Sequence, residues 1–372
     1  MSKTVSSTDI IAPGSVIGII GGGQLGRMTA LAAANLGYAC HIFCPEAQSP
    51  AMLVSSASTI AAYSDAVAIN AFAKAVDVVT FEFENIPHET VQLIEDHVPV
   101  RPGWRALHVS QNRLREKEFL NQNGAPTAPY RKVESAAGLD AALKEIGRPA
   151  VLKTAAMGYD GKGQVKIDES MSAAEAWAMM GSDLGILEGF VDFSAEISVV
   201  IARKADGTWA AFDPVENRHA HHILDLTLAP ALLSESLSTK AVDLARKIAE
   251  ALDYVGVLAV EMFLTKGDEI LVNEIAPRPH NSGHWTMDAC ATSQFEQLVR
   301  AVCNLPLGSP ARHHDAVMKN LIGEDVEKWR EALACENAHL HLYAKREARA
   351  GRKMGHINYL FPKGTRPKDV PA

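Results

Sequence analysis

The chain has 372 residues, of which 47% are hydrophobic and 22% are charged, and its formal net charge is −8 at pH 7. This composition is typical of a globular protein and excludes disorder as the main state. An acidic chain is also a poor general binder of nucleic acid, because such binding depends on the neutralisation of phosphates. The length predicts two or three domains.

The sequence predicts a cytoplasmic protein without a membrane partner. No apolar run approaches the ~18 residues that a spanning helix needs, and the first residues lack the pattern of a signal peptide. The five cysteines are odd in number and loosely spaced. They are therefore expected to be buried free thiols rather than disulfides.

The first part of the chain, which we place at residues 1–116, predicts a parallel α/β domain, because strands alternate with helices. The expected elements are strands at 16–20, 38–43 and 75–83, a helix at 27–36, and a charged helix at 113–123 that leads out of the domain.

The glycine-rich stretch after the first strand matches the pattern G-x-G-x-x-G through Gly21, Gly23 and Gly26. Its backbone could approach a phosphate at the start of the helix. Glu46 follows at the distance where a dinucleotide-binding fold places its ribose-binding acid. The pattern is compatible with a nicotinamide-dependent oxidoreductase, and equally with glycines that only permit tight packing.

Glu82 and Glu84 lie two positions apart near the carboxyl end of the last strand expected in this domain. They would share one face of that strand, at the end where open α/β sheets bind ligands. We expect them to hold ribose hydroxyls or an amine. The alternative is a solvated sheet edge.

After residue 149 the pattern changes to short strands joined by tight turns, which predicts an α+β domain with antiparallel sheets. Asp206–Gly207 and Gly267–Asp268 are expected to be hairpin turns. The expected elements are strands at 150–154, 165–167, 196–203, 209–212, 257–264 and 270–275 and helices at 172–180 and 238–252. The tail from 339 to 361 predicts strands around a basic turn.

A second glycine-rich loop, GYDGKGQ from Gly158 to Gln164, lies between two expected strands. It is not a Walker loop, because Lys162 is followed by Gly163 rather than by Ser or Thr. The loop predicts a lid whose amides close over phosphates, with Lys153 as a fixed cation on the entering strand. The alternative is an ordinary flexible hairpin.

Counting outward from a two-residue turn at Gly267 and Asp268 places Glu261 opposite Glu274. Facing like charges destabilise a sheet, and a bound cation reverses that effect. Because both ligands are hard oxygens, Mg²⁺ completed by a phosphate is the expected ion, with Asn273 as a further oxygen. The alternative is an exposed edge where the two charges splay apart.

Glu188 and Glu196 flank an apolar segment that could form a hinge in a nucleotide pocket, where backbone groups of Glu188 and Val191 would meet a base. A zinc site at the histidine cluster is not favoured, because two of its three members alternate on a strand and no fourth ligand is near. The cluster comprises His219, His221 and His222.

A basic run near the end of the chain lies in a turn between apolar strands, where it could form an anion pocket rather than a solvated charged face. Its cations are Lys345, Arg346, Arg349, Arg352 and Lys353.

Several motifs in order resemble those of the ATP-grasp enzymes. They are Lys153, GYDGKGQ, Glu188, Glu196, Glu261 and the pair Asn273–Glu274. The stretches GGGQLGRM, FEFEN, PRPHNSGHW and KREARAGRKMGH narrow the resemblance to the 5-(carboxyamino)imidazole ribonucleotide synthetases of purine biosynthesis. The resemblance extends from about residue 18 to 361.

The resemblance implies three domains: an N-terminal Rossmann-like α/β domain, an ATP-grasp domain at 117–308 with its lid at about 125–190, and a small β-rich domain at 309–372. It implies a ligase that uses ATP, Mg²⁺ and bicarbonate to carboxylate the exocyclic amine of aminoimidazole ribonucleotide through carboxyphosphate. It also implies a homodimer formed through the N-terminal domain.

The resemblance further assigns residues to roles. The ATP contacts implied are Arg113, Lys153, Gly158, Tyr159, Asp160, Gly161, Lys162, Gly163, Gln164, Glu188, Gly189, Phe190, Val191, Glu196, His219, Asn273 and Glu274. The ribonucleotide contacts implied are Gly23, Gln24, Leu25, Glu82, Tyr159 and Asp160, with Lys345 and Arg352 for its 5′-phosphate. Glu261 and Glu274 would hold the metal, and Arg278 would act with Lys153 in catalysis, facing the carboxyl phosphate. Met157 stands where the family commonly has glycine.

Three alternatives stay open at this point. A sister ATP-grasp enzyme would use formate and glycinamide ribonucleotide, although the GYDG loop and the RKMGH tail favour the first interpretation. The oxidoreductase would depend on the first glycine loop and Glu46. A non-enzymatic nucleotide-binding module would leave the facing carboxylates unexplained.

Overall fold

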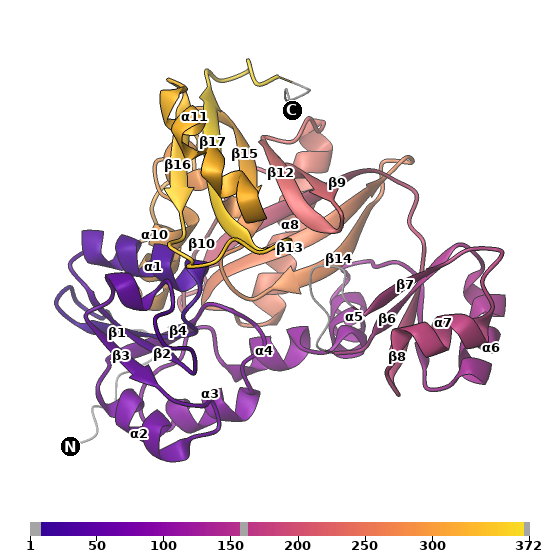
Figure 1. Ribbon diagram of the computed structural model, residues 1–372, viewed down its shortest axis with the longest axis horizontal. Helices are drawn as coiled ribbons and strands as arrows, with labels where there is room; N and C mark the ends of the chain where they lie inside the picture. Colours follow the sequence, from indigo (N-terminus) through magenta and orange to yellow (C-terminus); the bar gives the residue numbers. More distant parts are fainter. Residues whose placement is uncertain (1–8, 157–162, 368–372) are drawn as a thin grey trace.

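The computed structural model describes residues 9–156 and 163–367. Three sheets form its framework, of four, four and nine strands in chain order (Figure 1). Within the described ranges, no helix has the length and apolar character needed to cross a membrane. The predicted lid residues Gly158 to Lys162, together with Met157, lie outside the described residues.

The N-terminal sheet is parallel, in the order β3-β2-β1-β4, as predicted. Strands β1 and β4 are almost fully buried because helices cover the sheet, which is normal for parallel sheets. Helix α1 begins three residues earlier than predicted, directly after Gly23. The elements are β1 (Val16–Ile20), α1 (Gln24–Asn35), β2 (Ala39–Cys44), β3 (Ala57–Ile60), α2 (Ala66–Lys74), β4 (Val78–Phe81), α3 (His88–Glu95) and α4 (Trp104–Ser110).

The second sheet is smaller and antiparallel, in the order β5-β8-β6-β7. Two helices pack on it and bury a core that includes Leu139, Leu152 and Leu187. One of them, α7, starts at Ser172 with a capping box to Glu175. The elements are β5 (Tyr130–Val133), α6 (Ala136–Ile146), β6 (Ala150–Thr154), β7 (Gln164–Ile167), α7 (Ala173–Met180) and β8 (Gly185–Gly189).

The third sheet has nine strands, and its longest path runs β14-β13-β9-β11-β12-β15-β17-β16, with β10 beside β9. Its strands are β9 (Phe193–Arg203), β10 (Trp209–Ala211), β11 (Val215–Ala220), β12 (Ile223–Ala229), β13 (Gly256–Thr265), β14 (Ile270–Ala276), β15 (Asp315–Ile322), β16 (Ala338–Leu342) and β17 (Lys353–Phe361). The helices that accompany it are α5 (Arg113–Gln122), α8 (Glu235–Ala251), α9 (Thr286–Ala289), α10 (Gln294–Val302) and α11 (Trp329–Ala334). The C-terminal strands join this sheet through the pair β12–β15. The basic turn between β16 and β17 begins at Tyr343, which packs against Leu25 and Met28 of α1, so the turn lies beside the N-terminal part (Figure 1).

The hairpin of β13 and β14 differs from the prediction in one detail. The Thr265 amide donates to the Glu269 carbonyl at 2.8 Å, so the loop has three residues rather than two. A bulge at Asn273 then shifts the register by one residue, and Glu261 still pairs with Glu274. The predicted facing of the two carboxylates is confirmed, although the predicted turn is wrong.

Two further expectations about strands are wrong. Strand β4 ends at Phe81, so Glu82 and Glu84 lie beyond it and do not share a strand face; each carboxylate is drawn to a different partner. His221 and His222 do not lie on a strand, because they form the two-residue turn between β11 and β12, with φ of 51° and 64°. Of the three clustered histidines, His219 alone is on β11.

Candidate active site

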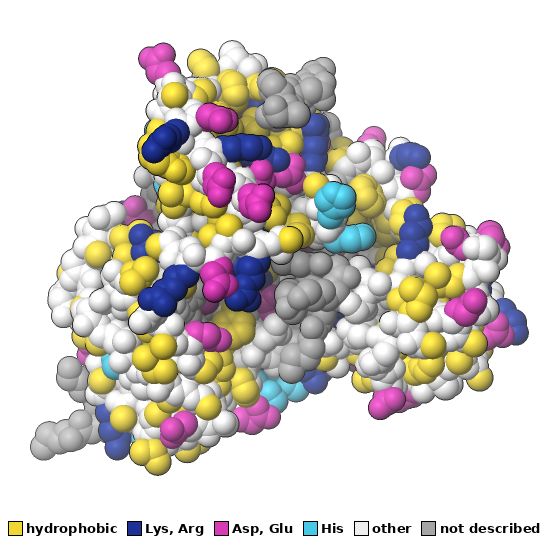
Figure 2. Space-filling view, viewed as in Figure 1, with side chains coloured by type: hydrophobic (Ala, Val, Ile, Leu, Met, Phe, Trp, Pro, Cys, Tyr) yellow, Lys and Arg dark blue, Asp and Glu magenta, His cyan; other side chains and the backbone are white. Residues whose placement is uncertain are grey.

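A cavity of about 1150 Å³ opens between the N-terminal sheet, the two other sheets and the C-terminal basic turn. On the face shown in Figure 2, basic and acidic side chains gather where the N-terminal part meets the C-terminal strands. The predicted site residues that line the cavity are Gly23, Gln24, Leu25, Glu82, Arg113, Lys153, Gln164, Glu188, Gly189, Phe190, Val191, Glu196, His219, Glu261, Asn273, Glu274, Arg278, Lys345 and Arg352. Gly163 is the described exception: its carbonyl accepts the Thr154 amide at 2.9 Å.

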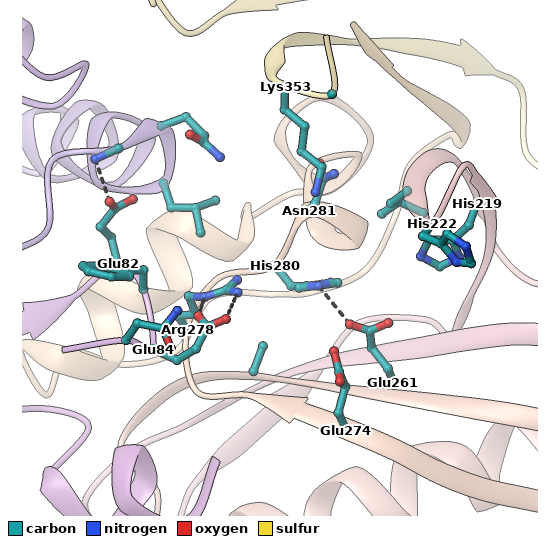
Figure 3. Close-up of a pocket in the computed structure, with 18 of the residues that line it drawn as sticks. Glu82, Glu84, His219, His222, Glu261, Glu274, Arg278, His280, Asn281 and Lys353 are labelled. Atoms are coloured by element: carbon teal, nitrogen blue, oxygen red, sulfur yellow. Dashed lines mark hydrogen bonds and ion pairs between the residues drawn. The ribbon is translucent and has the colours of Figure 1, made fainter. Parts of the chain in front are cut away.

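The carboxylates of Glu261 and Glu274 point into the same part of the cavity (Figure 3). Glu261 lies 3.1 Å from Nε2 of His280, and Glu274 lies 2.9 Å from Nη1 of Arg113. Burial raises the pKa of Glu261, but the charge of His280 and its hydrogen bond outweigh burial and lower that pKa to about 2. Glu261 is therefore charged, as a metal ligand must be.

The residues present fit a magnesium ion. Besides the two carboxylates, the buried Oδ1 of Asn273 has no hydrogen-bond partner in the described part of the chain. Hard oxygen donors of this kind suit Mg²⁺, which usually takes its other ligands from phosphates and water. Among the described residues, no group of three or more His, Cys, Asp or Glu side chains is placed to hold a metal ion, so an ion at this pair would take its other ligands from elsewhere.

A buried group of opposite charges lies on the other side of the cavity. Glu188 on β8 accepts from Lys153 on β6 at 3.1 Å, and Nζ of Lys117 lies 3.3 Å from the same carboxylate oxygen. Burial raises the pKa of Glu188, but the two lysines lower it to about 2. Its second oxygen, Oε1, is buried without a partner among the described residues. Lys117 was not predicted, because no local pattern connects it to β8.

The lowered pKa of Glu188 predicts how the free energy of unfolding changes in acid. Its folded pKa is below the unfolded value of 4.5, so its ionised form adds stability that is present above pH 4.5 and is lost as the pH falls toward 2. The difference in free energy of unfolding between the wild type and Glu188→Gln should therefore be largest near neutral pH and shrink below about pH 4. Urea unfolding between pH 7 and pH 3 measures it, and a constant difference would contradict the assignment of a charged Glu188.

Arg278 is held by a residue of the N-terminal part. Its Nε and Nη2 donate to the two carboxylate oxygens of Glu84, the latter at 2.8 Å, and its Nη1 donates to the carbonyl of Pro279 at 3.1 Å. Such a forked pair fixes the plane of the guanidinium. Glu84 is thus the partner of Arg278 (Figure 3), and the use of its carboxylate for a ribose or an amine stays a prediction.

Two residues of the segment PRPHNSGHW were not singled out from the sequence. His280 pairs with Glu261, and Asn281 lines the same cavity (Figure 3). The Asn281 side chain is 9% exposed, and both of its polar atoms lack a partner in the described ranges. The available signal in the sequence was that this run of polar residues directly follows the strand that carries Glu274.

The first glycine-rich loop holds a carboxylate. The amides of Gly23 and Gly26 donate to the two oxygens of Glu82 at 2.6 and 3.1 Å. Burial raises the pKa of Glu82, while the two amides oppose that shift. A dinucleotide fold would present these amides to a pyrophosphate, so the geometry does not favour the oxidoreductase.

This packing makes a prediction for Gly23→Ala. A Cβ at Gly23 would lie 2.6 Å from Oε1 of Glu82, so the carboxylate must move and lose its amide contact. We expect a loss of about 1–3 kcal/mol in the free energy of unfolding, measured with urea. Gly267→Ala is the matched control, because its Cβ would meet only Thr265 Oγ1, at 3.8 Å. Equal effects of both substitutions would contradict this account.

The segment between Glu188 and Glu196, which is the expected hinge, and the basic turn between β16 and β17 complete the cavity wall. Nδ1 of His219 lies 3.0 Å from Glu196, whose hydrogen bond and charge raise the pKa of His219 against the lowering effect of burial. Phe190 directly follows β8 and is exposed, with Lys166 of β7 over its ring at 4.6 Å. In the turn, Nζ of Lys345 donates to the Lys353 carbonyl at 2.7 Å.

The fold and this site define an ATP-grasp ligase, since two sheets enclose a cavity with the facing carboxylates of Glu261 and Glu274 on one side and the buried Lys153 on the other. Residues 118–295 match the model of the ATP-grasp domain, residues 15–111 that of the ribonucleotide synthetase preATP-grasp domain, and residues 316–366 that of the phosphoribosylaminoimidazole carboxylase C-terminal domain. The chain belongs to the N5-carboxyaminoimidazole ribonucleotide synthases.

The similarity to individual relatives covers almost the whole chain. The N5-carboxyaminoimidazole ribonucleotide synthase of Brucella melitensis is 49% identical over 95% of this chain and 98% of its own. The ADP complex of a solved synthetase has a TM-score of 0.92 at 46% identity, and covers 95% of this chain and 94% of its own.

A synthase from Aspergillus clavatus in complex with ADP and 5-aminoimidazole ribonucleotide has a TM-score of 0.86 at 32% identity, covering 94% of each chain. The chain also matches 38% of the length of a bifunctional purine synthesis protein from Dictyostelium discoideum, at 46% identity.

Proposed function

We propose that this chain carboxylates the exocyclic amine of 5-aminoimidazole ribonucleotide with ATP and bicarbonate, and forms N5-carboxyaminoimidazole ribonucleotide, ADP and phosphate in purine biosynthesis. The observation that carries the proposal is the facing pair Glu261 and Glu274 in a cavity shared with Arg278. The relatives named as complexes with ADP and with the ribonucleotide support it.

In the first step, an oxygen of bicarbonate attacks the γ-phosphorus of ATP, and the bond to the ADP oxygen breaks. Phosphoryl transfer depends on alignment and charge neutralisation more than on covalent help. Lys153 would contact the phosphates from the smaller sheet. Mg²⁺, held by Glu261 and Glu274 with Asn273 beside them, would neutralise the phosphate charge when bound.

Arg278, His280 and Asn281 would bind the bicarbonate. Bicarbonate both accepts and donates hydrogen bonds, and Asn281 has a donor and an acceptor without a partner in the described residues. The forked contact with Glu84 would hold the Arg278 guanidinium toward the new carboxyl phosphate. These groups lie next to the metal pair (Figure 3).

In the second step, the exocyclic amine attacks the carboxyl carbon, the bond from that carbon to the phosphate oxygen breaks, and the amine loses a proton. Free CO₂ released from carboxyphosphate could be the species attacked. Lys345 and Arg352 would bind the 5′-phosphate, and the region of Gly23 to Leu25 with Glu82 would bind the rest of the ribonucleotide. Tyr159 and Asp160, outside the described residues, are proposed to reach the imidazole.

The remaining ATP contacts are proposed at the hinge. Backbone groups of Glu188 to Val191 would meet the base, and Glu196 with His219 would lie near the ribose and phosphates. We further propose that the protein acts in the cytoplasm as a homodimer formed through its N-terminal domain.

The test is phosphate release from ATP with magnesium and bicarbonate, measured with and without aminoimidazole ribonucleotide. We expect release that depends on the ribonucleotide. An intact protein that binds ATP and releases no phosphate would contradict the proposed substrate. Formate with glycinamide ribonucleotide serves as the control for the sister reaction, and NADH quenching of tryptophan fluorescence serves as the control for the oxidoreductase.

A further inference from the structure

Helix α5 presents three side chains to the edge strand β14. Arg113, Glu116 and Lys117 are spaced i, i+3 and i+4, so they lie on one face of the helix. They contact three consecutive residues, 273–275, of β14. The contacts are Arg113 Nη1 to Glu274 Oε2 at 2.9 Å, Ile275 N to Glu116 Oε1 at 2.8 Å, and Lys117 Nζ to Asn273 O at 3.0 Å.

Residues 273–275 are the irregular part of the hairpin that β13 and β14 form. Its pairing with β13 shifts at this point, so Asn273 is the extra residue of a bulge, and β14 is the edge of its sheet. Backbone groups at an edge or a bulge lack ladder partners. The helix supplies the missing hydrogen bonds, and so fixes the backbone from which Glu274 projects.

The same Nζ of Lys117 has a second contact, with the smaller sheet. It lies 3.3 Å from Oε2 of Glu188, the same oxygen that Lys153 approaches to 3.1 Å. The side chains of Lys117 and Glu188 are only 2% and 4% exposed. Charges removed from water in this way depend strongly on their partners. One ammonium group therefore joins β8 of the smaller sheet to β14 of the larger one.

We propose that Lys117 is a positioning residue that sets the separation between the two halves of the ATP site. It does not line the cavity itself. Through the carboxylate of Glu188, which Lys153 also contacts, it acts on the part of the site proposed to bind the phosphates. Through the carbonyl of Asn273, it acts on the part proposed to bind the metal. The inference rests on the proposed roles of Lys153 and Glu274.

The loss of the ammonium has two consequences for the site. Glu188 keeps its contact with Lys153, with the charge of Arg113 acting on it as well, so its carboxylate holds Lys153 more strongly and draws that lysine away from the phosphates. The Asn273 carbonyl loses its donor, so the bulge relaxes and the metal ligands move. The ribonucleotide site is formed by other parts of the chain and keeps its contacts.

The experiment compares Lys117→Met with Ile69→Ala. Ile69 is 1% exposed in the core of the N-terminal part, so its truncation lowers stability without touching the ATP site. Both variants are assayed well below their midpoints of thermal unfolding. The readouts are kcat, the KM for ATP, the KM for aminoimidazole ribonucleotide and the magnesium concentration for half-maximal rate.

For Lys117→Met we expect the KM for ATP and the half-saturating magnesium concentration to rise by about tenfold or more, because small displacements of positioned groups have effects of this size. The KM for the ribonucleotide should change by less than about twofold. Ile69→Ala should leave all four values within about twofold of the wild type.

A Lys117→Met protein with the kinetic constants of Ile69→Ala would overturn the inference. If Lys117→Met does not fold, Lys117→Gln, which keeps a donor and loses the charge, is expected to show the same rise in KM and magnesium demand, and wild-type constants would overturn the inference. A wild type that shows no ribonucleotide-dependent phosphate release would refute the proposed function instead.

Discussion

We expect Glu274→Ala to abolish turnover, with a loss in kcat of more than about 10³-fold, while the protein stays folded. Glu274 is one of the two facing carboxylates, and it also binds Arg113 at 2.9 Å. Without it, the proposed magnesium ion loses a ligand and the phosphates lose part of their charge neutralisation. Phosphate release at saturating ATP, bicarbonate and ribonucleotide measures the effect.

Glu269→Gln is the matched control for this substitution. Glu269 belongs to the same hairpin, but it is exposed at the loop end and does not line the cavity. It should keep the wild-type rate. Full activity of Glu274→Ala at ordinary magnesium concentrations would contradict the assignment of Glu274 as a magnesium ligand.

The second large effect is expected for Arg278→Lys. Lysine keeps the positive charge, but it cannot make two parallel hydrogen bonds to Glu84 as the guanidinium does. We expect kcat to fall by about 10²-fold and the KM for ATP to change by less than about threefold, because Arg278 is proposed to act on the carboxyl phosphate and not on the nucleotide.

Glu84→Gln tests how much the orientation of Arg278 contributes, because the arginine and its charge are kept while its partner changes. The amide can accept one of the two hydrogen bonds from Arg278, so we expect a smaller loss of about tenfold in kcat. Asp96→Asn, an exposed change in the same part of the chain, is the control. A larger effect of Glu84→Gln than of Arg278→Lys would mean that Glu84 has a role of its own in the reaction.

The facing of Glu261 and Glu274 shows how a prediction from sequence can succeed while one of its premises fails. The hairpin signal at Gly267–Asp268 and the strand patterns on either side placed the two residues opposite each other. The loop has one more residue than predicted, and the bulge at Asn273 compensates for it. Bulges depend on packing against other elements, here against α5, and no local pattern predicts them.

Glu82 and Glu84 show the opposite case. Their position after a buried strand correctly predicted that they line the cavity. Their partners are an amide pair more than 50 residues earlier and an arginine 194 residues later. A period of two along a strand carries no information about such partners, so the expected common face was wrong.

The sequence by itself determined the parallel N-terminal sheet, the antiparallel sheets after residue 149, the first glycine-rich loop and the facing of Glu261 and Glu274. These features depend on periodicity, turn chemistry and ordered motifs within short stretches. Only the tertiary structure decided that Glu82 fills the first glycine loop, that Glu84 orients Arg278, and that Lys117 joins the two sheets. In each case a charged side chain meets a partner far away in the chain, and burial selects such partners only once the sheets have packed together.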